Sequence, residues 1–115
     1  MNITWIPLRQ ASQIAEAVAV SQQQPVLIFK HSHRCNISAS ALNRLERRWE
    51  ADFGHKIQCY MVDVVADRPT SLQLAEELGV YHESPQAIVL AQGKVQYHES
   101  HLGITYEAIR EAAEQ

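Results

Sequence analysis

The sequence predicts an α/β sandwich with the element order β-α-β-α-β-α-β-β-α and helices on both faces of a mixed central sheet. Three observations lead to this fold class. Apolar runs alternate with helical patterns along the chain. Residues 26–29 are continuously apolar and residues 57–65 are predominantly apolar, and both runs predict strands buried on both faces. Gln92-Gly93 predicts a tight hairpin turn. Right-handed crossovers restrict the topology further.

The first quarter of the chain predicts a short strand, a helix and the start of a central strand. Residues 3–8 alternate weakly, and Pro7 suits a strand end or a sheet edge. Ser12 is the expected N-cap of a helix that runs to about residue 21. Pro25 closes this helix and introduces the strand at 26–29.

The central strand leads into one long helix. After the polar segment 30–34, apolar side chains recur at i, i+3, i+7 and i+11, which predicts a single helix over about 36–53. These core-facing residues are Leu42, Leu45, Trp49 and Phe53. Gly54 is the residue expected to terminate this helix, at the C′ position.

The next segment repeats the strand-and-helix pattern. The second buried strand covers 57–65, and residues 67–70 form a turn. Thr70 or Ser71 caps a helix that ends at Gly79.

The C-terminal part predicts a hairpin and a last helix. Residues 80–85 form a loop, and the strand at 87–90 pairs with an alternating strand at 94–97. Thr105 is the expected cap of the final helix. The alternation of elements extends over residues 1–115 without a linker or repeat, so we expect one domain.

Composition and charge exclude several classes of function. The 115 residues carry 10 basic and 13 acidic side chains, for a formal net charge of −3. This balance favours neither nucleic acid nor an anionic membrane surface as a partner. No stretch approaches the roughly 20 apolar residues of a membrane span, and the first residues do not resemble a secretory leader. We therefore expect a cytoplasmic protein.

Cys35 is the candidate reactive group. It follows a buried strand and directly precedes a helical pattern, which places it at a helix N-terminus. Unpaired N–H groups and the positive end of the helix dipole favour a thiolate there, as do the neighbouring His33 and Arg34. The competing interpretation is a small buried hydrophobic residue, which polar neighbours disfavour.

The other cysteine and the histidines support different interpretations. Cys59 lies in the middle of the strand at 57–65, which predicts a packed, inert thiol. His31, His33 and Cys35 could together contact zinc, but only scattered histidines at 82, 98 and 101 could complete a site. We therefore expect no metal.

Three collinear stretches resemble a known family. They are FKHS at 29–32 leading to CNIS at 35–38, VDV at 62–64, and HESPQA at 82–87. The combination is similar to the monothiol bacilliredoxin family (the YtxJ-like group) of the thioredoxin-like superfamily. Members commonly have Pro directly after the active cysteine, whereas this chain has Asn36, which adds an N–H near the sulfur.

The resemblance implies roles for particular residues. Cys35 would be the nucleophile, supported by its neighbours Arg34, Asn36, Ile37 and Ser38. Ser38 stands where dithiol relatives have a resolving cysteine. Ser84 and Pro85 would form a cis-proline loop that binds substrate.

The resemblance also implies an activity in redox homeostasis. The chain would be a thiol–disulfide oxidoreductase that removes a low-molecular-weight thiol from S-thiolated client proteins. Bacillithiol would be the co-substrate, and no cofactor would be bound. Two alternatives stay open: a non-catalytic thioredoxin-like module in which Cys35 is a redox-sensing or incidental thiol, and a stress-response interaction protein.

Overall fold

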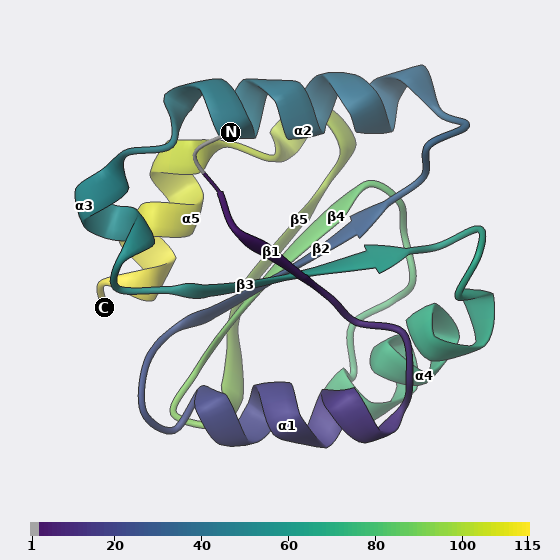
Figure 1. The fold of residues 1–115 in the computed structure, drawn as a ribbon, viewed down its shortest axis with the longest axis horizontal. Coiled ribbons are helices and arrows are strands. Elements are labelled where there is room, and N and C mark those ends of the chain that lie inside the picture. Colours follow the sequence, from purple (N-terminus) through teal and green to yellow (C-terminus); the bar gives the residue numbers. More distant parts are fainter. Residues whose placement is uncertain (1–2) are drawn as a thin grey trace.

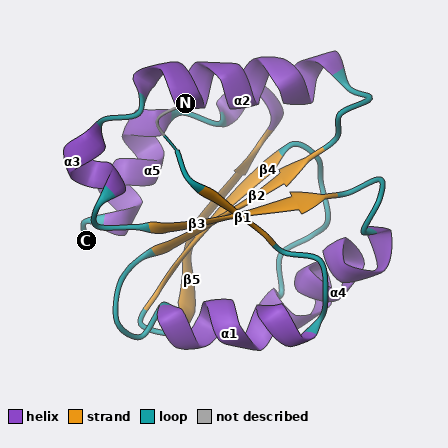
Figure 2. Ribbon diagram, viewed as in Figure 1, coloured by secondary structure: helices purple, strands orange, loops and turns teal. Residues whose placement is uncertain are grey.

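The computed structural model describes residues 3–115, which form a five-stranded sheet between two layers of helices (Figure 1, Figure 2). The strands lie in the order β1-β3-β2-β4-β5. Strands β1, β3 and β2 are parallel, whereas β4 and β5 are added antiparallel, so the sheet is mixed as predicted. The strands are β1 (Trp5–Pro7), β2 (Val26–His31), β3 (Gln58–Asp63), β4 (Gln86–Ala91) and β5 (Lys94–Ser100).

The helices cover both faces of this sheet (Figure 1). One face carries α1 (Ser12–Val20) and α4 (Arg68–Leu78). The opposite face carries α2 (Asn36–Arg48), α3 (Ala51–Gly54) and α5 (Tyr106–Ala113). A short 3₁₀ turn, η1 (His101–Gly103), connects β5 to α5. The predicted element order is confirmed, with α3 and η1 added to it. Within residues 3–115, no helix has the length and apolar character needed to cross a membrane.

Strand β2 divides the interior into two cores. Its side chains alternate between the faces of the sheet, because successive residues in a strand point in opposite directions. Leu27 and Phe29 join the core under α2, α3 and α5, whereas Val26 and Ile28 join the core under α1 and α4. Both sets are fully buried, as the continuous apolar run predicted.

The prediction of a single long helix over 36–53 is wrong. The backbone becomes extended at Trp49 and Glu50, which separates α2 from α3. Contacts with α5 explain the break, because the Glu50 carboxylate accepts hydrogen bonds from Tyr106 and Arg110. Trp49 and Phe53 are still core residues, as expected, and both rings pack against Tyr106.

Gly54 has a different role from the one predicted. It is the last residue of α3 and does not adopt a left-handed conformation. A Cβ atom at this position would lie 3.0 Å from Nε1 of Trp49. The absence of a side chain therefore makes room for the indole of Trp49.

Other helix ends are partly as predicted. Gly79 ends α4 with a φ of 68°, and the Thr105 hydroxyl accepts a hydrogen bond from the N–H of Ala108 at the start of α5. Ser12 is not an N-cap. It is the first residue of α1, and the Gln13 side chain instead accepts hydrogen bonds from the backbone N–H groups of residues 9 and 10.

Two boundaries near the carboxyl end of β3 also differ. The strand ends at Asp63 rather than at residue 65, because its carboxylate accepts hydrogen bonds from the N–H groups of Val65 and Ala66 and turns the chain. Helix α4 begins at Arg68 rather than at Thr70 or Ser71, with Pro69 in its first turn.

Candidate active site

Cys35 lies where strand β2 passes into helix α2. Its backbone is extended, with φ −116° and ψ 120°, and it is the N-cap residue of α2. Its N–H donates to the carbonyl of Ser32 at 3.1 Å, and its side chain is half-buried and reduced. The first N–H groups of a helix have no partner within the helix, and Cys35 lies at that end of α2. The predicted placement of Cys35 is therefore found.

Ser38 connects the first turn of α2 to the end of β2. Its hydroxyl oxygen accepts a hydrogen bond from the N–H of Ser32 at 3.0 Å and lies 2.7 Å from Nδ1 of His31. The side chain is fully buried, although it lies in the first turn of a helix at the surface of the molecule. Its hydroxyl fixes the loop that carries Cys35.

His31 is the partner that the sequence did not single out for this role. It is half-buried, and desolvation lowers its pKa, with smaller opposing effects of Asp63 and Glu46. A neutral imidazole is favoured near pH 7 and can accept the Ser38 proton through Nδ1. His31 is thus a positioning residue beneath the Cys35 loop.

The loop before β4 lies beside the Cys35 loop. The peptide bond between Ser84 and Pro85 is cis, as the resemblance implied. Pro85 is buried, and its carbonyl accepts a hydrogen bond from the N–H of His101 at 3.0 Å. The hydroxyl of Ser84 is buried and has no hydrogen-bond partner among residues 3–115.

A groove of about 430 Å³ joins these two loops to the start of α4. Among the predicted site residues, it brings together Cys35, Arg34 and Ser84, and it adds Arg68 and His82. Figure 1 shows why these residues lie together, since the loops that follow β2 and β3 leave the sheet at the same end, where both strands finish. Of the other predicted supporting residues, Asn36 and Ile37 lie on the exposed side of the first turn of α2, outside this groove.

Lys30 lies behind the groove and is fully buried. Its ammonium group donates to the carbonyl of Ser71 at 3.1 Å and lies 3.0 Å from Nδ1 of His82. Burial lowers the pKa of Lys30 to about 8. Burial also lowers the pKa of His82, and the charges of Lys30 and Arg68 add to this effect. A neutral His82 that accepts from Lys30 through Nδ1 carries its proton on Nε2.

The sequence contained a signal for Lys30 but none for its partners. A lysine that continues a buried apolar run is exceptional, because lysine is almost never fully buried unless it is paired. His82 and Arg68 come from later segments, and in the sequence His82 is only one of several scattered histidines. Their proximity depends on the crossovers through β3 and α4.

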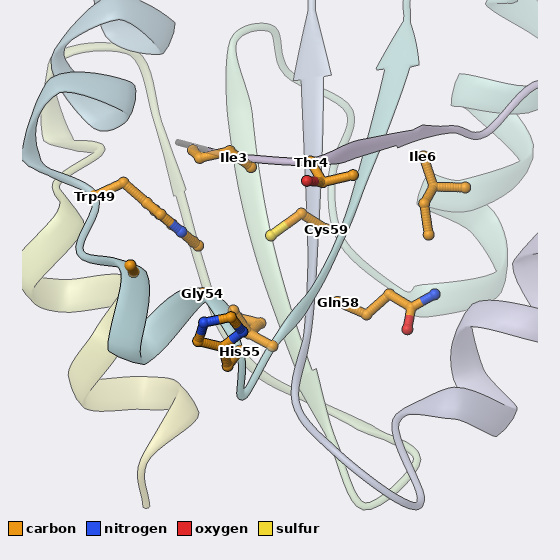
Figure 3. A pocket seen from close by; sticks show the side chains of 10 residues that line it. Ile3, Thr4, Ile6, Trp49, Gly54, His55, Gln58 and Cys59 are labelled. Carbon is orange, nitrogen blue, oxygen red and sulfur yellow. The ribbon is translucent and has the colours of Figure 1, made fainter. Parts of the chain in front are cut away.

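Cys59 lies in a different part of the molecule. It lines a cavity of about 390 Å³ together with Trp49, and Figure 3 shows its sulfur pointing from β3 toward the side of the cavity that Trp49 lines. Cys59 pairs with Leu27, four residues from the end of β2, or roughly 13 Å at about 3.3 Å per residue. Cys59 is packed in the core, as predicted, and burial raises the pKa of its thiol to about 12, which is consistent with the expectation of an inert thiol.

The histidines near Cys35 have other partners. His33 pairs with Asp63 at 3.5 Å, and His31 is bound to Ser38. Within residues 3–115, no group of three His, Cys, Asp or Glu side chains is arranged to hold a metal ion.

Comparison with solved structures defines the class of protein. A protein that is assigned as an oxidoreductase and has a thioredoxin fold matches with a TM-score of 0.78 and 28% identity, over 93% of this chain and 91% of its own. The thioredoxin of Malassezia sympodialis matches with a TM-score of 0.73 and 17% identity, over 97% and 90%. That of Fasciola hepatica matches with a TM-score of 0.69 and 15% identity, over 94% and 95%. The two thioredoxins show the fold alone.

The chain is therefore a thiol–disulfide oxidoreductase with a thioredoxin fold. A family model described as monothiol bacilliredoxin BrxC matches residues 6–109, and the chain belongs to this family. The resemblance seen in the sequence is confirmed. This membership favours an enzyme over a non-catalytic binding module.

Proposed function

We propose that this protein removes bacillithiol from mixed disulfides on client proteins, with Cys35 as the nucleophile. The observation that carries the proposal is the separation of the two thiols. Cys35 is accessible at the start of α2 beside the cis-proline loop, whereas Cys59 is buried at the other end of the sheet. At the position where dithiol relatives have a second, resolving cysteine, this chain has Ser38.

The reaction requires two exchange steps. The Cys35 thiolate attacks the bacillithiol sulfur of the mixed disulfide, a bond forms between these two sulfurs, and the client sulfur leaves as a thiolate that takes a proton from water. A second thiol from solution then attacks the bacillithiol sulfur on Cys35. That step produces a new small disulfide and restores the Cys35 thiolate. The electrons that reduce the client sulfur thus come from the second thiol, which is oxidised into the new small disulfide.

Ser38 is consistent with a mechanism that uses one cysteine. A cysteine at this position could expel the small thiol by forming an internal disulfide, whereas a hydroxyl cannot. The Ser38 hydroxyl is moreover engaged with Ser32 and His31. The adduct on Cys35 therefore persists until an external thiol arrives.

The cis-proline loop suits an extended client segment. Ser84 lines the groove next to Cys35, and the loop continues directly into β4. An extended peptide that carries the modified cysteine could pair with exposed backbone here, as peptides do when they add to a strand. Such pairing would bring the mixed disulfide to the Cys35 sulfur.

A single-turnover transfer experiment tests the proposal. A bacillithiolated model protein is mixed with the reduced enzyme without other reductant, and intact masses are followed. We expect the bacillithiol mass to move to the enzyme. Cys35→Ser should abolish this transfer, and the matched control Cys59→Ser should retain it, because Cys59 is packed under the α2 layer. Equal loss in both variants, or an adduct on Cys59, would contradict the single-cysteine mechanism.

A further inference from the structure

We infer that the groove beside Cys35 is a subsite for the carboxylate groups of the small thiol, with Arg34 and Arg68 as the residues that recognise them. This inference rests on the proposed function and specifies the class of co-substrate, a small thiol that carries negative charge. Bacillithiol, with its malate group, belongs to this class.

The charged side chains that line the groove are all basic. Arg34 comes from the Cys35 loop and Arg68 from the first residue of α4, so two separate segments deliver a guanidinium group to one groove. Neither arginine side chain forms a hydrogen bond or ion pair within residues 3–115. By contrast, Arg48 pairs with Glu107 and Arg110 pairs with three carboxylates on the opposite side of the molecule.

The nearest acidic groups do not neutralise these arginines. One oxygen of Asp63 is bound to the N–H groups of Val65 and Ala66, and the other faces His33. Asp67 precedes Arg68 and Glu83 follows His82 in the chain, but neither acidic residue lines the groove. The guanidinium forks are therefore available to a ligand, and their planar geometry matches carboxylates well.

The groove also offers neutral donors. In the described part of the chain the buried hydroxyl of Ser84 has no partner, which is costly unless a ligand completes its hydrogen bonding. His82 is held by Lys30 at Nδ1, which leaves its Nε2–H as a donor and places a buried positive charge behind it. Donors and cations thus surround one side of the Cys35 sulfur.

Three disulfides of similar size but different charge test this subsite. Dithiodipropionate is anionic, hydroxyethyl disulfide is neutral and cystamine is cationic. The rate at which each one thiolates Cys35 is measured by intact mass on the full chain. Division by the rate with the neutral probe removes any change in the reactivity of the sulfur itself.

We expect Arg68→Ala and Arg34→Ala each to lower the anionic-to-neutral ratio about three- to fivefold, the size of one exposed ion pair. The cationic-to-neutral ratio should rise. Arg68→Glu should give a larger fall than Arg68→Ala. The matched control is Arg47→Ala, which removes an exposed arginine from the last turn of α2 and should keep both ratios.

The possible outcomes separate the two proposals. If all probes load Cys35 but the ratios are the same in the wild type and in both alanine variants, the carboxylate subsite is refuted and the exchange activity stands. If no probe loads Cys35 in the wild type, the proposed exchange function fails as well. A change of equal size in Arg47→Ala would attribute the effect to overall charge and overturn the subsite.

Discussion

Replacing Lys30 by methionine should change how the stability of the protein depends on pH. Burial lowers the pKa of Lys30 from its ordinary value of 10.5 to about 8. Below about pH 8, both the folded and the unfolded chain hold the proton, so the folded state bears the full cost of the buried charge. Between about pH 8 and 10.5, the folded chain releases the proton first, and the free energy of unfolding rises.

The size of this effect follows from the pKa difference. A difference of one in pKa corresponds to about 1.4 kcal/mol, which gives an upper limit of about 3.4 kcal/mol for Lys30. Residual hydration around the ammonium group reduces this limit. We therefore expect wild-type stability to rise by about 1–3 kcal/mol relative to Lys30→Met between about pH 7 and pH 10.

Urea unfolding at several pH values measures this difference. Taking Lys30→Met as the reference cancels the contributions of the tyrosines and Cys59 to the pH dependence of stability, because these groups titrate in both proteins. Lys94→Met, at an exposed position in β5, is the matched control and should track the wild type at every pH. If the free energies of unfolding of the wild type and Lys30→Met differ by the same amount at every pH between about 7 and 10, the argument that Lys30 is a buried cation is refuted.

Three further predictions concern the two loops and the two thiols. Ser38→Ala should lower the free energy of unfolding by about 2–3 kcal/mol, because it leaves the N–H of Ser32 and Nδ1 of His31 without their partner. The control Ser40→Ala, at an exposed position, should change the free energy of unfolding by less than about 0.5 kcal/mol. A similarly small effect in both variants would show that the Ser38 hydroxyl does not fix the loop. Ser38→Cys should form an internal disulfide with Cys35 in place of a stable small-thiol adduct, since residues three apart lie on one helix face; an adduct that persists in the mass spectrum would show that residue 38 cannot reach the sulfur. Iodoacetamide near neutral pH should alkylate Cys35 long before Cys59, whose pKa is raised to about 12; equal rates would contradict the burial of Cys59.

Local sequence was sufficient to predict the part of the fold that holds Cys35. A continuous apolar run specifies β2, and the change from strand to helical periodicity at residues 35–36 places the cysteine at the start of α2. The turn at Gln92-Gly93 was equally local, because both residues adopt positive φ angles. These features depend on neighbours within one turn or one strand.

The features that could not be predicted depend on distant residues. The break between α2 and α3 brings Glu50 and Asp52 to Arg110, which is 60 and 58 residues further along the chain. The helical pattern through Trp49 and Phe53 continues across the break, so nothing local marks it. The groove likewise combines Arg34 with Arg68, and only the parallel pairing of β2 and β3 brings their loops together.

Strand β2 gives the active site a strict dependence on register. Lys30 and His31 are neighbours in sequence, yet the first anchors His82 from one face of the sheet and the second holds Ser38 from the other. Deleting or inserting one residue within β2 would exchange the two faces, because side-chain direction in a strand alternates at every position. The lysine would then enter the α2 layer and the imidazole the α4 layer. Whether a residue of β2 has an even or an odd number thus determines the face of the sheet that it occupies. One side of Cys35 therefore has the buried Lys30 ammonium group, and the other side has the neutral His31 imidazole.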